Sequence, residues 1–184
     1  TGARSKDYED ALEWLKDAGM IYQIFNISKP GMPLTAYQEI DAFKIYACDT
    51  GRLRLLAKLP ADIIMSPTSN YVEFKGALAE NAALQSLVTI ADDMPSYWSS
   101  PSKSEVEFVI QVGTEIIPVE VKAEGNISGR SIGIYNDKYS PTYRCRYSML
   151  NLQFNGNLLS CPYPLIDWSL GLLGLNKSGT IGEE

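Results

Sequence analysis

Three charged residues that could form a metal-dependent active site lie within one short stretch of the chain. Glu107 precedes a Gly113-Thr114 turn signal, and Glu120 and Lys122 follow it. Residues two apart on a strand share a face, so Glu120 and Lys122 should point the same way. Carboxylates suit Mg²⁺ or Mn²⁺, and a lysine can orient a water or offset transition-state charge. This pattern predicts metal-assisted phosphodiester cleavage.

The register of the surrounding hairpin supports this interpretation. Two β-rich runs, 105–112 and 115–122, flank Gly113, which suits a two-residue type II′ turn. That turn pairs Glu107 directly with Glu120, with Cβ atoms about 5 Å apart, where like charges repel unless a cation lies between them. The opposite face is then entirely apolar, formed by Val106, Phe108, Ile110, Ile117, Val119 and Val121.

A third carboxylate is expected nearby, on a helix over residues 74–90. Glu80 shares one helical face with Ala77, Leu84 and Leu87, so it is either a partner of the hairpin acids or a boundary residue of an amphipathic helix. The predicted metal ligands are therefore Glu80, Glu107 and Glu120, and Lys122 completes the catalytic set. The alternative is an exposed hairpin whose glutamates point into solvent, because Glu-x-Lys alone is a common sequence.

The composition limits the chemistry. The chain has no histidine, which excludes histidine-dependent triads and histidine-containing zinc sites. Its net charge is −6, and residues 61–168 hold twelve acidic against seven basic side chains. Such a surface does not attract nucleic acid by its overall field, so binding should be weak and salt-sensitive. The candidate docking residues are Arg130, Lys138, Arg144 and Arg146.

Residues 1–60 read as the remnant of a winged-helix unit. We expect a helix over 7–18, capped by Asp7, and strands over 20–26 and 44–48, separated by a Pro/Gly turn at 28–33. A further helix is expected over 52–59. The first helix is strongly acidic, which disfavours DNA reading and favours a structural or protein-contact role.

The remaining segments complete an α/β pattern. Residues 60–72 resemble a linker, 95–101 a loop and 127–139 a helix, and strands are expected at 143–149 and 158–163. The predicted domains are the winged-helix remnant 1–60, a core domain 61–168 and a tail 169–184. Within the tail, Gly171–Ser178 resembles a P-loop but lacks a preceding strand, so we expect no nucleotide site there.

The order of several motifs resembles a known family. The motifs are Lys44–Gly51, Gly76–Asn81, Glu105–Ile110, Ile117–Lys122, Arg144–Ser148 and Pro162–Leu165. They are similar to the C-terminal region of prokaryotic AAA+ P-loop ATPases, which carries domain of unknown function 4143 with a PD-(D/E)xK nuclease-like fold. The resemblance implies a restriction-endonuclease-like mixed sheet flanked by helices, preceded by a partial winged helix.

The resemblance also implies roles and partners. Glu80 would be the helix acid and Glu107, Glu120 and Lys122 the nuclease-like set, whereas the family usually has Asp at the position of Glu107. The extra methylene moves that carboxylate by more than the tolerance of about 0.5 Å of an active site, which predicts weak metal binding and low or absent cleavage. ATP would bind in an N-terminal ATPase domain, since a chain beginning at Thr1 reads as a fragment.

Two functions follow from these observations. The first is a nuclease-like module that binds Mg²⁺ or Mn²⁺ at Glu80, Glu107 and Glu120. The second is a catalytically inactive interaction or regulatory module for the attached ATPase domain. The expected partners are that domain and, secondarily, nucleic acid. No membrane association is expected, and the three widely spaced cysteines, Cys48, Cys145 and Cys161, suit a reducing cytoplasm.

Overall fold

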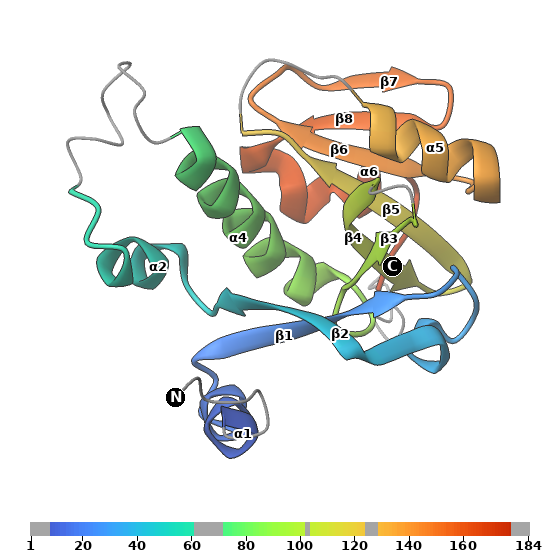
Figure 1. The fold of residues 1–184 in the computed structure, drawn as a ribbon. Helices are drawn as coiled ribbons and strands as arrows, with labels where there is room; N and C mark the ends of the chain where they lie inside the picture. Colours follow the sequence, from blue (N-terminus) through green and yellow to red (C-terminus); the bar gives the residue numbers. More distant parts are fainter. Residues whose placement is uncertain (1–7, 61–71, 102–103, 124–128, 178–184) are drawn as a thin grey trace, which may run out of the picture.

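The chain folds around one mixed sheet of eight strands, seen here in a computed structural model (Figure 1). The structure describes residues 8–60, 72–101, 104–123 and 129–177. The strand order is β2-β1-β3-β4-β5-β6-β8-β7. The strands are β1 (Ile21–Ile27), β2 (Gln38–Ala47), β3 (Ser96–Ser99), β4 (Glu105–Val112), β5 (Glu115–Val121), β6 (Arg144–Ser148), β7 (Gln153–Asn155) and β8 (Leu158–Pro162).

Helices cover both faces of the central strands. The α-helices are α1 (Glu9–Asp17), α2 (Thr50–Leu56), α4 (Val72–Ile90), α5 (Arg130–Tyr139) and α6 (Ser169–Leu172), and the 3-10 helices are η2 (Leu34–Tyr37) and η3 (Tyr163–Trp168). One core cluster joins α4, η3 and α6 to one face of the sheet, with Leu84, Leu87 and Phe108 fully buried. A second cluster packs Tyr135 of α5 against Val109 on the opposite face. The predicted α/β class with a mixed sheet is confirmed.

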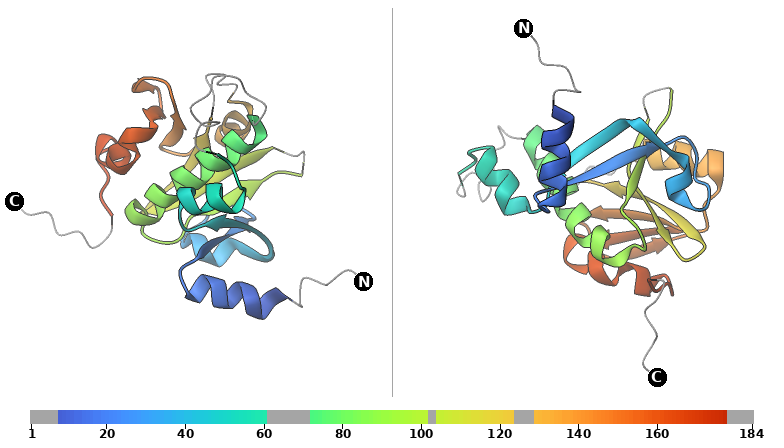
Figure 2. Two further views of the ribbon diagram at one scale, coloured as in Figure 1. Left: turned by 90° about the vertical axis from the view of Figure 1, so that its left-hand side faces the viewer. Right: turned by 90° about the horizontal axis from the view of Figure 1, so that it is seen from below.

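The first two strands form a long ribbon that continues the central sheet. β1 and β2 are antiparallel, and β1 also pairs in parallel with β3 through Asn26 and Tyr97. Ile24 of β1 is buried in the same cluster as Leu84 of α4. The order helix, strand, turn and strand is as predicted, but this ribbon shares its core with the following domain. Figure 2 shows α1 lying against the outer side of the ribbon.

The predicted hairpin register is confirmed over five residue pairs, from Phe108–Val119 to Val112–Glu115. Gly113 adopts a φ of 59° at the turn. A positive φ at the first central position is what a type II′ turn requires, and glycine adopts it without steric cost. This turn therefore sets the pairing of the two central strands.

Several boundaries differ from expectation. The sequence predicts a loop over residues 95–101, but Ser96–Ser99 form β3. Pairing with β4 provides hydrogen-bond partners for the backbone of these residues, and a short run of residue types does not reveal such a pairing. β2 begins at Gln38 rather than at residue 44, and the short β7 was not predicted. The Asp7 cap, most of the 60–72 linker, the start of the 127–139 helix and Ser178 lie outside the described residues.

In the described part of the chain, no helix is both long enough and apolar enough to cross a membrane.

Asn81 ties α4 to the end of β2 and yields a test of the fold. Its buried amide accepts from the Ala47 N–H at 3.0 Å and donates to the Ala47 carbonyl at 3.1 Å. Replacing Asn81 with Ala leaves both backbone groups without these partners, so we expect a loss of about 2 kcal/mol in the free energy of unfolding. Thr89→Ala, at an exposed position of the same helix, should cost less than about 0.5 kcal/mol in urea unfolding. Equal losses in both variants would contradict this role.

Candidate functional site

The predicted site residues gather where β4 begins and β5 ends. Glu107 comes from β4, Glu120 lies on β5, Lys122 directly follows β5, and Glu80 reaches this region from α4. The charges of Lys122, Glu120 and Glu80 all act on the Glu107 carboxyl, so the four groups lie within electrostatic range of one another. The fold therefore brings together the residues that the sequence singled out.

A bulge in β4 changes how the two hairpin glutamates face each other. β3 pairs Ser96 with Val109 but Trp98 with Val106, so β4 has one extra residue over this stretch. Val106 and Val109 consequently pack in the same cluster, on the α5 side. An extra residue breaks the alternation of a strand, and Glu107 acts electrostatically on Tyr46 and Tyr163 of the α4-side cluster, so Glu107 lies with Phe108 on the α4 side.

The prediction that Glu107 and Glu120 face each other on one side of the sheet is therefore wrong. Along β5, Val119 and Val121 belong to the α4-side cluster, which turns Glu120 toward the α5 side. The Gly-Thr turn fixed the register near the hairpin end, but the bulge lies at the other end. A sequence pattern of alternating residues gives no signal for it.

Glu107 is held in a partly buried position on the α4 side. Its Oε2 accepts a long hydrogen bond of 3.4 Å from the backbone N–H of Val121. Burial is the main cause that raises the pKa of Glu107 to about 7; a hydrogen bond to its own backbone and the charge of Lys122 oppose the shift, and the negative charges of Glu120 and Glu80 add to it. The side chain is therefore shared between protonated and ionised forms near neutral pH.

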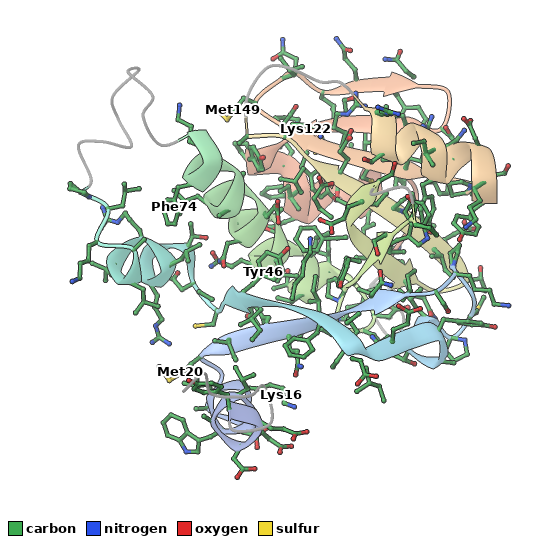
Figure 3. The ribbon with its side chains drawn as sticks, in the orientation of Figure 1. Lys16, Met20, Tyr46, Phe74, Lys122 and Met149 are labelled. Carbon is green, nitrogen blue, oxygen red and sulfur yellow. The ribbon has the colours of Figure 1, made fainter. Side chains whose placement is uncertain are left out.

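Two tyrosines complete the α4 side of the site. The Tyr46 hydroxyl donates to Oε2 of Glu80 at 2.9 Å, and Figure 3 shows Tyr46 between β2 and α4. The Tyr163 hydroxyl donates to the backbone carbonyl of Lys122 at 3.0 Å. Burial, together with the charges of Glu80 and Glu107, raises the pKa of Tyr163 to about 12. Both phenols therefore remain protonated donors beside the two acids.

On the α5 side, Glu120 forms a buried ion pair with Arg146. The two residues are neighbours on the parallel strands β5 and β6, and Nε of Arg146 lies 2.7 Å from Oε2 of Glu120. Glu120 is 1% exposed and Arg146 8% exposed. A charge removed from water this completely needs a matching charge and hydrogen bonds, and Arg146 supplies both.

The second oxygen of Glu120 is less well satisfied. Nζ of Lys122 lies 3.2 Å from Oε1, which is close enough for an ion pair. Within the described residues, however, buried Oε1 has no hydrogen-bond partner. The amine of Lys122 therefore attracts this oxygen electrostatically but does not have the geometry of a hydrogen bond to it. Both oxygens of Glu120 are nevertheless next to protein cations, Lys122 and Arg146. These cations lie where a metal ion bound to Glu120 would have to lie.

Gly129, at the start of α5, closes the other side of the ion pair. A Cβ atom at this position would lie 2.0 Å from Nη2 of Arg146 and 3.4 Å from Oε2 of Glu120. The guanidinium thus packs directly against the helix backbone, which a side chain at residue 129 would obstruct. The positive end of the α5 dipole favours the negative charge of Glu120 and disfavours the positive charge of Arg146. The Glu120 carboxylate therefore offsets the cost of placing Arg146 at this end of the helix.

This arrangement does not fit a divalent ion at the three predicted ligands. A Mg²⁺ site needs oxygens that converge at about 2.1 Å from one point. Glu80 is bonded to Tyr46, and Glu120 faces Arg146 on the other side of the sheet. Among the residues that the structure describes, no three acids or cysteines are grouped so that they could hold a metal ion.

Most of the predicted docking cations make contacts within the protein. Arg146 is buried in its pair with Glu120, so its assignment to a nucleic-acid surface is wrong. The Arg144 guanidinium donates twice to Oδ1 of Asn157, and Nζ of Lys138 lies over the rings of Trp98 and Tyr139. These contacts leave Arg130 as an exposed basic residue at the start of α5.

Two residues that define the chemistry of the site have roles that the sequence did not indicate. Arg146 was predicted to be a surface cation, and the spacing gives no signal against this, because Arg144, two residues earlier on the expected strand, shares its face. Tyr46 had no signal as a partner of Glu80, since the two are 34 residues apart and meet through the packing of α4 on β2.

Comparison with known protein families gives two matches. Residues 75–164 match the model of a domain of unknown function, DUF4143. Residues 1–62 match a second domain of unknown function, DUF8612. Neither a curated protein nor a solved structure matches the chain. The predicted recognition of domain of unknown function 4143 is thus confirmed, and its span includes Glu80, Glu107, Glu120, Lys122 and Arg146.

The buried ion pair predicts a specific pattern of stability losses. Arg146→Met leaves Glu120 buried without its main partner, so we expect a loss of about 3–5 kcal/mol in the free energy of unfolding. The double variant Glu120→Leu with Arg146→Met removes both charges and should recover much of that loss. Arg144→Met, a matched change two residues away, should cost about 1 kcal/mol. Additive losses in the double-variant cycle would contradict a direct pair.

The raised pKa of Glu107 predicts a pH dependence of stability. Its carboxyl binds a proton more tightly in the folded protein than in the unfolded chain. The protonated carboxyl therefore contributes fully to the free energy of unfolding at pH values below its pKa in the unfolded chain. This contribution is lost as the pH rises through its pKa in the folded protein, about 7. We expect the free energy of unfolding to fall by on the order of 2 kcal/mol between about pH 5 and about pH 8. Urea unfolding of Glu107→Gln should show a flatter profile, and an unchanged slope would contradict the assignment.

Proposed function

We propose that the chain is a catalytically inactive interaction or regulatory module, built on a restriction-endonuclease-like frame, for an attached ATPase domain. The observation that carries this proposal is the state of Glu120. In the nuclease-like set this residue would hold the metal ion, but here it is buried and paired with Arg146. An arginine in this position supplies the positive charge that a divalent ion would otherwise bring.

The charge and surface of the chain support the same proposal. A net charge of −6 opposes the approach of a phosphate backbone. At the same time, several large apolar side chains are exposed, including Trp14, Ile40, Leu55 and Leu56. Of these, Ile40 lies with Phe25 and Phe43 along one open groove, and an exposed apolar patch of this kind suits contacts with other proteins. The balance therefore favours protein binding over nucleic-acid cleavage.

The second candidate is a metal-dependent phosphodiesterase. Glu107, with its pKa raised to about 7, lies in electrostatic range of Lys122 and Glu80, which is a suitable setting for acid–base chemistry. For this function Glu120 would have to release Arg146 and turn toward Glu107. The two candidates therefore differ in whether the ion pair opens when a divalent ion is supplied.

The test measures whether Mn²⁺ binds and whether cleavage occurs. Melting of the wild-type chain should shift by less than about 1 °C when millimolar Mn²⁺ is added, because a ligand that does not bind the folded state cannot stabilise it. A plasmid-nicking assay under the same conditions should show no cleavage. Glu120→Gln and Lys122→Ala serve as the matched variants in both assays.

Two outcomes would overturn the proposal in favour of the phosphodiesterase. One is a rise in melting temperature with Mn²⁺ that Glu120→Gln abolishes. The other is wild-type nicking that is lost in both Glu120→Gln and Lys122→Ala. The regulatory part is tested separately, by measuring ATP hydrolysis of the full-length protein before and after removal of this module, and an unchanged rate would contradict it.

A further inference from the structure

The outer face of the β1–β2 ribbon is unusually apolar for a surface that points away from the main core. Ile24 of β1 points inward into the core, whereas Phe25 points outward. Phe25 is paired with Phe43 of β2, and their rings meet edge to face at 6.3 Å. Ile40 and Ile45 of β2 are also exposed, Ile40 at 77%. A solvent-facing side of an antiparallel ribbon normally carries polar residues.

Helix α1 lies beside this apolar face and leaves Ile40 and Phe43 exposed. It is amphipathic, yet none of its residues is buried. Four of its side chains, spaced as one helical face, line the space between helix and ribbon; they are Glu9, Leu12, Glu13 and Lys16. The helix therefore forms one wall of an open groove and leaves the apolar floor accessible.

The groove has a definite size and charge. Its volume is about 880 Å³; Phe25, Ile40 and Phe43 line it from the ribbon, and Leu12 lines it from α1. Its rim carries Glu9, Glu13 and Asp41 against Lys16, three acidic groups and one basic group. Helix α1 repeats this bias, with four acidic residues and Lys16 between Glu9 and Asp17. The groove is thus apolar at its base and negative at its edges.

We propose that this groove is the docking site for a basic amphipathic helix of a partner protein. Apolar side chains of that helix would fill the floor, and lysines or arginines on its flanks would meet Glu9, Glu13 and Asp41. This is the helix-in-groove mode of recognition, in which apolar residues anchor and charges select. The inference rests on the proposed function as an interaction module and identifies the surface through which the module would bind its partner.

Charge complementarity selects this occupant over others. A nucleic acid would bring its phosphates against an acidic rim, which repels them. A second copy of the chain would bring the same acidic rim and an overall charge of −6. A basic helix satisfies both the apolar floor and the negative edge, since its own flanking cations steer it toward the groove.

The test titrates the 184-residue chain with a synthetic peptide in a calorimeter. The probe is an amphipathic helix of about 18 residues with leucine on one face and lysine on its flanks. We expect micromolar binding that weakens as salt is raised. The same peptide with glutamate in place of lysine should not bind. The double variant Glu13→Lys with Asp41→Lys should bind the lysine peptide at least about tenfold more weakly, equivalent to about 1.4 kcal/mol.

Variants of the floor and of distant positions complete the design. Ile40→Ser should reduce affinity without unfolding the chain, because this side chain is already exposed. Met149→Ser and Asp137→Lys change comparable side chains elsewhere and should leave binding unaltered. Figure 3 shows Met149 at the opposite end of the molecule from Lys16 of α1. Circular dichroism checks that every variant keeps its fold.

Three results would overturn the proposal. The first is no binding of the lysine peptide below about 1 mM, the range of non-specific contacts. The second is equal binding by wild type, Ile40→Ser and the charge-reversed variant. The third is a dimer in solution that Ile40→Ser dissociates, which would make a second copy the occupant. None of these changes the Mn²⁺ and nicking results, so failure of the groove and failure of the inactive-module proposal are distinguishable.

Discussion

The burial of the Glu120 carboxylate is the constraint on which the centre of this structure depends. A carboxylate at 1% exposure in the middle of a sheet must be matched, and the match comes from the neighbouring strand through Arg146. Because β5 and β6 are parallel and in register, the two side chains point to the same face. The start of α5 then has to approach closely, and a glycine at position 129 permits this approach. One ion pair thus links two strands and a helix.

The same constraint decides the chemistry that the site can perform. Glu120, which the sequence predicted to be a metal ligand, is here part of the internal framework through its pair with Arg146. The acids on the other side of the sheet, Glu80 and Glu107, are embedded among tyrosine hydroxyls and backbone donors instead. Positive charge is therefore supplied by Arg146 and Lys122 next to Glu120, while burial raises the pKa of Glu107 to about 7.

The amino-terminal ribbon shows a different use of the same sheet. β1 joins the central sheet through β3, so its inner face contributes Ile24 to the main core. Its outer face remains apolar and is flanked by an acidic helix. The molecule therefore has a charged interior pair at its centre and an accessible apolar groove at its edge, which is the reverse of the usual distribution. The first serves stability and the second is available for binding.

The sequence by itself determined the local features of this protein. Apolar spacing predicted α1 and α4, and Gly113 predicted the turn and the register of the central hairpin, because these depend on residues close together in the chain. The domain match over residues 75–164 follows from sequence as well. Tertiary structure alone decided the partners of the site residues. Arg146 meets Glu120 across 26 positions, Tyr46 meets Glu80 across 34, and the bulge at Glu107 arises from pairing with β3. Such contacts depend on which strands and helices become neighbours, and no local pattern of residues specifies that.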